Sequence, residues 1–163
     1  MADNIIKIFS EVPEAMDDAL QALDRLDTDI KAARARWGNP PDRFSQPGFS
    51  ALVRIILGQQ ISRAVANTLW LRMTEHSWCD APALAALDYS ALQNIGLSRS
   101  KAEYIIDLAR AEAEGRLDLE ALGQQPAEIF TQKLIAYRGV GGWTVSNYRL
   151  FCLVDLDAWP GND

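Results

Sequence analysis

Apolar residues recur along most of this chain at the three- and four-residue spacing that places them on one face of an α-helix. The clearest stripe contains Phe49, Leu52, Val53 and Ile56, and we expect it to face a core. The sequence has no convincing alternating run of β-branched residues, so the pattern predicts an all-α protein. The predicted helices cover residues 13–24, 27–37, 48–60, 62–76, 82–86, 88–94, 99–113, 117–122, 126–137 and 143–154.

The connection between two of these helices has the residue types of a helix end and a helix start. Gly96 suits the end of the first helix, because glycine adopts a positive φ without strain, and Ser98 suits the N-cap of the second. The apolar residues that the second helix would bury are Ile105, Ile106 and Ala109. A helix connection of this kind needs no further function, and a phosphate contact by Lys101 is an open alternative.

Size and composition predict a single globular domain over residues 1–163. The chain has 163 residues, of which 48% are hydrophobic and 23% are charged. It contains neither a membrane-length apolar run nor a signal-peptide pattern, so we expect an intracellular protein, cytoplasmic if bacterial, with no membrane partner. We also expect a monomer. The two cysteines, Cys79 and Cys152, cannot supply the four thiolates of an iron–sulfur cluster, and we expect both to be buried. The single histidine, His76, is expected in solvent.

The net charge of −6 and the sequence pI of about 4.8 argue against nucleic acid as a partner, because nucleic-acid binding normally uses clustered Lys and Arg. Two physical facts weaken that argument. Salt screens surface charges over about 8 Å, so the local patch matters more than the total charge. Backbone N–H groups also bind phosphate without adding formal charge.

A glycine-rich hairpin lies between the last two predicted helices. Gly139, Val140, Gly141 and Gly142 let the chain turn sharply and approach a ligand closely, and the helix that follows begins at about Trp143. Its unpaired N–H groups and positive dipole end would bind an anion such as a DNA phosphate. An ordinary glycine-capped helix pair is the structural alternative. The apolar residues that we expect to face the core from this helix are Leu150, Phe151 and Val154.

The junction of the helices predicted at 48–60 and 62–76 carries a polar residue where the apolar stripe continues. Gln60 occupies that position, and Gly58 loosens the helix just before it. A glutamine there must be hydrogen-bonded or must point outward where the helix ends. The simple interpretation is a satisfied polar residue between two helices.

Three motifs resemble the helix-hairpin-helix (HhH-GPD) DNA glycosylase superfamily, and within it the 3-methyladenine DNA glycosylase II type. They are I-L-G-Q-Q-I-S at residues 56–62, G-L-S-R-S-K-A at 96–102, and the hairpin G-V-G-G-W-T at 139–144 followed by D-A-W-P-G-N-D at 157–163. The resemblance covers about residues 27–163. It implies an all-α glycosylase fold, with the hairpin at 134–154 and a catalytic loop at 155–163.

The resemblance also implies roles for individual residues in base excision from duplex DNA with alkylated bases. Asp163 would be the catalytic carboxylate, and Gln60 would enter the space left by an extruded base. Trp143 and Tyr148 would form the base pocket, with Trp37 or Trp159 as additional aromatic walls. The hairpin residues that would bind a DNA phosphate are Gly139, Val140, Gly141, Gly142 and Thr144.

Further expectations concern cofactors and the reaction product. The family's hairpin binds a monovalent cation through backbone carbonyls, and here those places are held by Ile135, Tyr137 and Val140. No cofactor is otherwise required. Trp143 stands where strand-cutting members have a lysine nucleophile, so the resemblance implies a monofunctional glycosylase. Arg138 replaces the usual proline before the hairpin.

The resemblance predicts closing helices after Asp163, so we expect the chain to be truncated at its C-terminus. As written it would bind DNA weakly and turn over poorly. Two other functions compete with the glycosylase: a non-catalytic helix-hairpin-helix DNA-binding module, and a helical protein-interaction module. The second rival leaves the glycines of the hairpin and the W-P-G-N-D loop unexplained.

Overall fold

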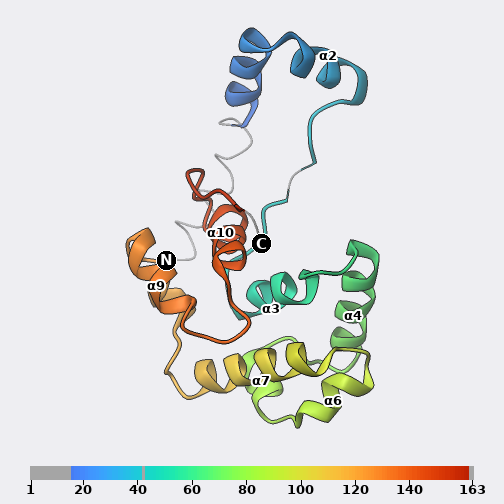
Figure 1. Cartoon of the computed structure of the whole chain (residues 1–163), viewed down its shortest axis with the longest axis vertical. Coiled ribbons are helices and arrows are strands. Elements are labelled where there is room, and N and C mark those ends of the chain that lie inside the picture. The colour runs from blue at the N-terminus through green and yellow to red at the C-terminus, as the bar shows by residue number, and fades with distance from the viewer. Residues whose placement is uncertain (1–15, 42, 162–163) are drawn as a thin grey trace. The chain divides into compact units, whose positions relative to one another are not determined.

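The computed structural model describes residues 16–41 and 43–161, and within these ranges all regular structure is helical (Figure 1). The prediction of an all-α protein is therefore confirmed. The chain divides into two compact units, Met1–Phe44 and Ser45–Asp163. Each unit is described by itself, and the single domain expected over residues 1–163 stays a prediction.

In its described residues, 16–41 and 43–44, the first unit contains two consecutive helices, at residues 16–26 and at α2 (Thr28–Trp37). Asp27 separates them and starts α2, because its Oδ1 accepts hydrogen bonds from the N–H groups of Asp29 and Ile30 at 2.8 and 3.1 Å. The two helices are joined by an ion pair between Arg34 and Asp24, with an N–O distance of 2.6 Å.

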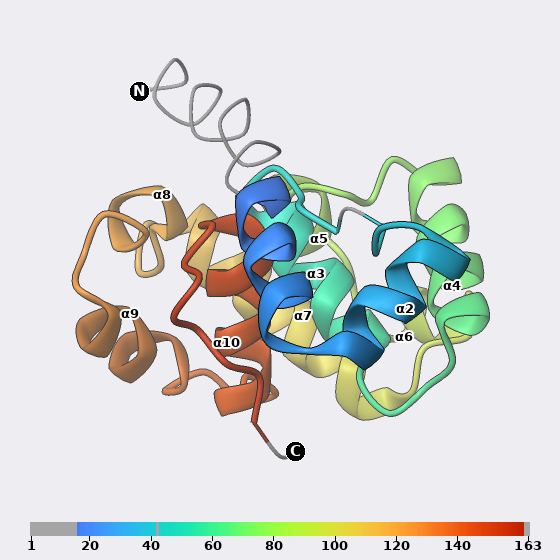
Figure 2. The same ribbon diagram turned by 90° about the horizontal axis from the view of Figure 1, so that it is seen from above.

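The second unit holds the remaining helices and a continuous core. They are α3 (Phe49–Gly58), α4 (Arg63–Glu75), α5 (Ala81–Ala85), α6 (Tyr89–Asn94), α7 (Arg99–Ala113), α8 (Leu119–Leu122), α9 (Ala127–Leu134) and α10 (Gly142–Cys152). Helix α3 lies at the centre and packs against α4, α7 and α10, while α5 and α6 pack against α7 (Figures 1 and 2). This arrangement brings the end of α3 close to both α7 and the start of α10.

The expected stripe on α3 is confirmed, since Phe49, Leu52, Val53 and Ile56 are all buried. The prediction for the apolar face of α10 is wrong. Leu150, Phe151 and Val154 are only half-buried, whereas the core contains Val145, Tyr148 and Cys152. These three residues form an i, i+3, i+7 stripe of their own, so the helix presents a different face to the core than we expected.

Most predicted helix ends agree with the structure to within one or two residues. Ser98 caps α7 by accepting a hydrogen bond from the N–H of Lys101 at 3.3 Å, and Gly96 has the expected positive φ of +107°. The exception is α9, which ends at Leu134 instead of residue 137. The N–H of Tyr137 donates to the carbonyl of Leu134 at 3.2 Å, so the chain tightens into a turn before the hairpin begins.

Several smaller expectations can be compared directly with the structure. Cys152 is buried, which raises the pKa of its thiol to about 12, but Cys79 is only half-buried. His76 is exposed as expected and stacks on Trp78 with 4.4 Å between ring centroids. Across the described ranges, none of the helices combines the length and the apolar character needed to cross a bilayer.

Candidate functional site

The junction between α3 and α4 presents Gln60 to solvent in an unusual backbone conformation. Helix α3 ends at Gly58, and Ser62 starts α4 by accepting a hydrogen bond from the N–H of Val65 at 3.3 Å. Between them, Gln60 is exposed and has a φ of +55°. A positive φ is uncommon outside glycine, and it holds the backbone of Gln60 away from the path of either helix. The outward alternative for this glutamine is therefore the one that the structure adopts.

The neighbouring Gln59 links this junction to the glycine hairpin. Its side-chain Nε2 donates to the carbonyl oxygen of Gly139 at 2.9 Å and to Oγ1 of Thr144 at 2.8 Å. Thr144 is 1% exposed, so its hydroxyl faces the interior. Thr144 can therefore make the predicted phosphate contact only through its backbone N–H, and not through its hydroxyl.

A half-buried lysine contacts the other side of the same junction. Nζ of Lys101, in the first turn of α7, donates to the carbonyl oxygens of Leu57 at 2.8 Å and Gln59 at 2.6 Å. These carbonyls lie at the negative end of the α3 dipole, where a cation is favourable. Burial lowers the pKa of the Lys101 ammonium from its ordinary value. Two of the three N–H donors of this ammonium are therefore bound to backbone carbonyls of the junction.

The hairpin depends on glycine at Gly139 and leaves its other two glycines open. Gly139 has a φ of +82°, and a Cβ built there would lie 2.1 Å from Cδ2 of Tyr104. Around a Cβ built at Gly141 or Gly142 there is nothing within 4 Å. Between these glycines, Val140 is buried and anchors the hairpin in the core. The two open glycines therefore expose backbone to an approaching ligand.

The N-terminus of α10 is not capped by a side chain. Gly141 occupies the N-cap, and the N–H of Val145 makes the first helical hydrogen bond to the Gly141 carbonyl at 3.1 Å. The N–H groups of the first three helical residues, Gly142, Trp143 and Thr144, precede that bond and point along the helix axis. Together with the positive end of the helix dipole, they suit a phosphate oxygen.

Trp143 lines a cavity next to the α3–α4 junction. The cavity has a volume of about 360 Å³, and Gly58 and Ile61, which flank the junction, line it as well. Its other lining residues are Arg54, Leu57, Arg63, Ala66, Asn67 and Trp70. The Arg54 guanidinium lies 5.2 Å from the ring centroid of Trp70. Two arginines beside two indole rings favour an anion or a neutral ring over a cationic one.

Tyr148, the second aromatic residue predicted for the base pocket, lies in the core, which corrects that assignment. It is 1% exposed, its ring stacks on Phe130 at 5.7 Å between centroids, and its Oη accepts a hydrogen bond from the N–H of Gly48 at 2.7 Å. Burial raises the pKa of its hydroxyl well above the ordinary value. The reason is helix geometry: a residue five positions after Trp143 is rotated by about 140° from it, whereas Asn147, four positions on, shares its face.

We expect Tyr148→Phe to lower the free energy of unfolding by about 1–2 kcal/mol, because the Gly48 N–H loses its acceptor while the ring packing is kept. Tyr89→Phe is the matched control. The Tyr89 hydroxyl donates to Asp107 at 2.8 Å on the surface, so this substitution should lower the free energy of unfolding by less than about 0.5 kcal/mol. Urea unfolding of the two variants measures both values, and equal losses would contradict a structural role for the Tyr148 hydroxyl.

The loop after α10 is anchored near its start. The Nε of Arg149 donates to Oδ2 of Asp155 at 2.9 Å, and the N–H of Asp157 donates to Oδ1 of Asp155 at 3.2 Å. Ala158 is buried, while Trp159 is 83% exposed and does not line the cavity beside Trp143. The predicted catalytic residue, Asp163, lies outside the described residues, so its role stays a prediction.

The other predicted aromatic wall, Trp37, belongs to the first unit, where it is 72% exposed and lies under the Arg36 guanidinium at 4.7 Å.

The residues expected to bind a cation lie in the turn that leads to the hairpin. The carbonyl of Tyr137 already accepts a hydrogen bond from the N–H of Val140 at 3.2 Å, which leaves one lone pair, and Ile135 is exposed. Carbonyl oxygens in a turn are chemically suitable for a hard cation. Within the described part of the chain, no three His, Cys, Asp or Glu side chains are grouped so that they could hold a metal ion.

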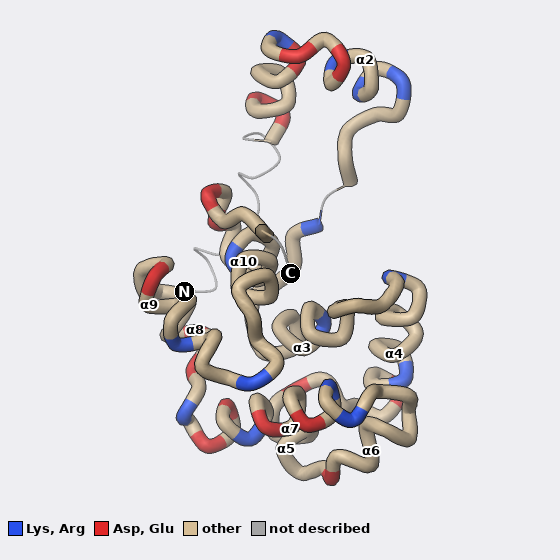
Figure 3. The backbone as a smooth tube through the Cα atoms, viewed as in Figure 1, with Lys and Arg blue, Asp and Glu red and all other residues tan. Residues whose placement is uncertain are grey.

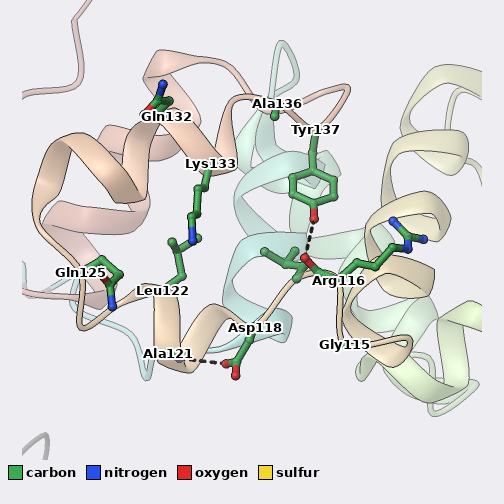
Figure 4. Close-up of a pocket in the computed structure, with 11 residues that line it drawn as sticks. Gly115, Arg116, Asp118, Ala121, Leu122, Gln125, Gln132, Lys133, Ala136 and Tyr137 are labelled. Atoms are coloured by element: carbon green, nitrogen blue, oxygen red, sulfur yellow. Dashed lines mark hydrogen bonds between the residues drawn. The ribbon is translucent and has the colours of Figure 1, made fainter.

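A larger cavity, of about 610 Å³, lies away from this site (Figure 4). It is formed by the turn between α7 and α8 and by α9, with Tyr137 and Lys133 in its wall. Oη of Tyr137 donates to the carbonyl of Arg116 at 3.1 Å across one side of the cavity. None of the residues that line it belongs to the junction, the hairpin or the cavity beside Trp143.

Charged residues of both signs are spread over the second unit (Figure 3). Within this mixture, Arg138 extends over the ring of Tyr104 at 5.5 Å, next to the hairpin, and Arg54 and Arg63 line the cavity. The candidate site therefore has arginines close to it although the net charge of the protein is negative, and the nearby charges matter more than the total.

Sequence reasoning did not identify Gln59 as a site residue, although it is the side chain that joins the two halves of the site. The one signal available was its position beside Gln60, where a second amide follows the end of an apolar helix. Its partners are Gly139 and Thr144, about 80 positions further along the chain, and no spacing rule connects residues that distant.

Comparison with known proteins agrees with this geometry. The sequence model of the HhH-GPD superfamily of base excision DNA repair proteins matches residues 53–158. The chain is 36% identical over 121 residues to YfjP of Bacillus subtilis, which covers 69% of this chain and 42% of that protein. It is 33% identical over 128 residues to the DNA-3-methyladenine glycosylase of the same organism, covering 71% and 42%.

The fold is also that of a solved glycosylase. This chain is similar to the structure of the 3-methyladenine DNA glycosylase of Schizosaccharomyces pombe in complex with abasic DNA, with a TM-score of 0.79. The superposition covers 90% of this chain and 75% of the yeast chain, and the two sequences are 24% identical. The hairpin between two helices of an all-α chain thus defines a helix-hairpin-helix protein with the glycosylase fold. More specifically, the chain belongs to the HhH-GPD superfamily of base excision DNA repair proteins. It spans less than half the length of the two curated relatives that it matches here.

Proposed function

We propose that this chain carries the DNA-binding hairpin and the active site of a base excision repair glycosylase that removes alkylated purines of the 3-methyladenine type from duplex DNA. The observation that carries the proposal is the link made by Gln59 between the exposed Gln60 and the hairpin. It joins a residue that can fill a gap in DNA to a backbone that can bind phosphate. Relatives named as DNA-3-methyladenine glycosylases support the choice of lesion.

DNA would be held by the hairpin and opened at Gln60. The uncapped N–H groups at the start of α10 would bind a phosphate, while Gln60 would occupy the space of the extruded nucleotide. Filling that space offsets the unstacking of the base, which costs a few kcal/mol. The amide of Gln60 can also hydrogen-bond to the unpaired base on the other strand.

The extruded base would stack on Trp143. The arginines of the adjacent cavity, Arg54 and Arg63, oppose entry of a cationic ring, so we assign them to DNA phosphates and assign the base to the exposed part of the Trp143 ring. Tyr148, in the core, would contribute only by fixing α10.

The chemical step would use one carboxylate. Cleavage of the N-glycosidic bond develops positive charge on the sugar, and Asp163 would stabilise this charge and assist the attacking water. A cationic alkylated purine is a good leaving group and needs no strong general acid. Because Trp143 occupies the place of a lysine nucleophile, no Schiff base would form there, and the product would be an abasic site.

No organic cofactor enters this scheme. The carbonyls of Ile135, Tyr137 and Val140 are proposed to hold a monovalent cation that would contribute its positive charge to the same phosphate. The protein would act as a monomer, inside the cell, on DNA.

The experiment that tests this function is base release from a duplex that contains 3-methyladenine, compared with the same duplex without the methyl group. We expect release from the methylated duplex alone, together with binding that weakens as salt rises. Salt-dependent binding without base release would contradict the glycosylase and favour a non-catalytic DNA-binding module. Absence of binding at low salt would contradict both and favour a protein-interaction module.

A further inference from the structure

We propose that Lys101 and Gln59 are positioning residues that fix Gln60 at the DNA interface and tie its location to that of the hairpin. This inference rests on the proposed function of Gln60. Neither residue needs to touch DNA for it, because both act through the backbone at the α3–α4 junction.

The first step of the argument is the peptide unit between Gln59 and Gln60. Nζ of Lys101 donates to the carbonyl oxygen of Gln59 at 2.6 Å, and that carbonyl belongs to the peptide plane from which the φ of Gln60 is measured. A second bond from the same Nζ, to the carbonyl of Leu57 at 2.8 Å, fixes the ammonium relative to the last turn of α3. Lys101 therefore restrains the orientation of the plane that precedes Gln60.

The second step is the cost of the conformation that is held. A φ of +55° is unfavourable for glutamine, because its Cβ approaches the backbone carbonyl, and such a residue keeps this conformation only when its surroundings impose it. The Lys101 and Gln59 contacts supply that restraint on the N-terminal side of Gln60. Without them, we expect the junction to relax toward ordinary φ values, which would turn the Gln60 side chain away.

The third step is the connection to the hairpin. While its carbonyl is held by α7, the side chain of Gln59 donates to Gly139 and Thr144 at the start of α10. One residue thus connects three elements: the end of α3, the first turn of α7 and the hairpin. Insertion into DNA requires Gln60 to lie at a fixed distance from the phosphate-binding N–H groups, and this connection provides such a constraint.

The test uses a duplex with an abasic-site analogue and a neighbouring 2-aminopurine, whose fluorescence rises when the base unstacks. We expect the unchanged protein to raise this signal and Gln60→Ala to lose most of the rise. Lys101→Met, which keeps the apolar stem without the donors, should lose it similarly, and Lys101→Arg should recover part of it. Lys133→Met is the matched control, because Lys133 is exposed on α9, and it should leave the signal unchanged.

Single-turnover base release gives a second readout. We expect Lys101→Met to slow release about tenfold, since a small misplacement of a residue that orients the substrate can have effects of this size. In a double-mutant cycle, adding Lys101→Met to Gln60→Ala should cause almost no further loss, because Lys101 acts through Gln60. Additive losses would overturn the proposal. So would a smaller salt dependence of DNA binding in Lys101→Met, which would instead indicate a direct phosphate contact.

The outcomes separate this inference from the proposed function. Unstacking that depends on Lys101, without base release by the unchanged protein, would support the inference and contradict the glycosylase. Base release by the unchanged protein, at a rate that Lys101→Met does not alter, would support the glycosylase and contradict the inference. Thermal unfolding of each variant accompanies these assays, and Gln59→Met serves as a second variant. If both substitutions abolish cooperative unfolding, the contacts hold the fold as a whole and the proposal is overturned.

Discussion

Replacing Gly139 by alanine should lower the free energy of unfolding by about 3 kcal/mol, the combined effect of a Cβ in left-handed backbone and of overpacking. The backbone at this position has a φ of +82°, and the added Cβ would lie 2.1 Å from Cδ2 and 2.7 Å from Cβ of Tyr104. Tyr104 lies on α7, so it cannot move aside without disturbing the helix that also supplies Lys101. Urea unfolding of the two proteins measures the loss.

Gly141→Ala is the matched control within the same hairpin. A Cβ at Gly141 meets nothing within 4 Å, and its φ of −99° is allowed for alanine, so we expect a change below about 0.5 kcal/mol. A second control combines Gly139→Ala with Tyr104→Ala, which removes the ring atoms but leaves the Tyr104 Cβ. It should relieve only part of the strain. Equal stability of the Gly139 and Gly141 variants would show that the hairpin does not depend on the close approach to Tyr104.

The helices of this protein could be predicted from local pattern, because caps and apolar periodicity are local properties of a sequence. Gly96 ends one helix and Ser98 starts the next through atoms only a few residues away, and the α3 stripe needs only a helical period. The face that α10 turns to the core was not predictable in this way. Its Leu150 and Phe151 are as apolar as its true core residues, and only the packing against α3 and α9 selects Tyr148.

The candidate site illustrates the same division between local and distant information. Gln60 and the glycines of the hairpin were recognisable, because a polar residue at the end of an apolar stripe and three glycines in four residues are local anomalies. The function of Gln59 and Lys101 depends on contacts with residues 42 to 85 positions away. A lysine in the first turn of a helix looks like an ordinary surface residue until the chain has folded.

Several groups that suit an anion remain at the site although the protein is acidic. Lys101 donates hydrogen bonds to carbonyl oxygens of the junction, and Arg149 pairs with Asp155 in the loop, so both cations already have partners. The groups left for phosphate are backbone N–H donors of α10, which carry no formal charge, and the arginines at the cavity. We therefore expect the salt dependence of DNA binding to correspond to few ionic contacts.

Asp163→Asn should slow base release from methylated duplex DNA by about 10²-fold or more, because the amide keeps the shape of the carboxylate but cannot stabilise positive charge on the sugar. Asp157→Asn is the matched control, since it removes the same charge from an exposed position in the same loop and should change the rate less than about twofold. Single-turnover release measures both, with DNA affinity determined in parallel so that binding and chemistry are separated. If the Asp163 variant retains the full rate, the carboxylate that acts on the sugar is another one, and the catalytic assignment of the loop fails. If both variants lose activity equally, the loop contributes through its total charge instead of through one placed group.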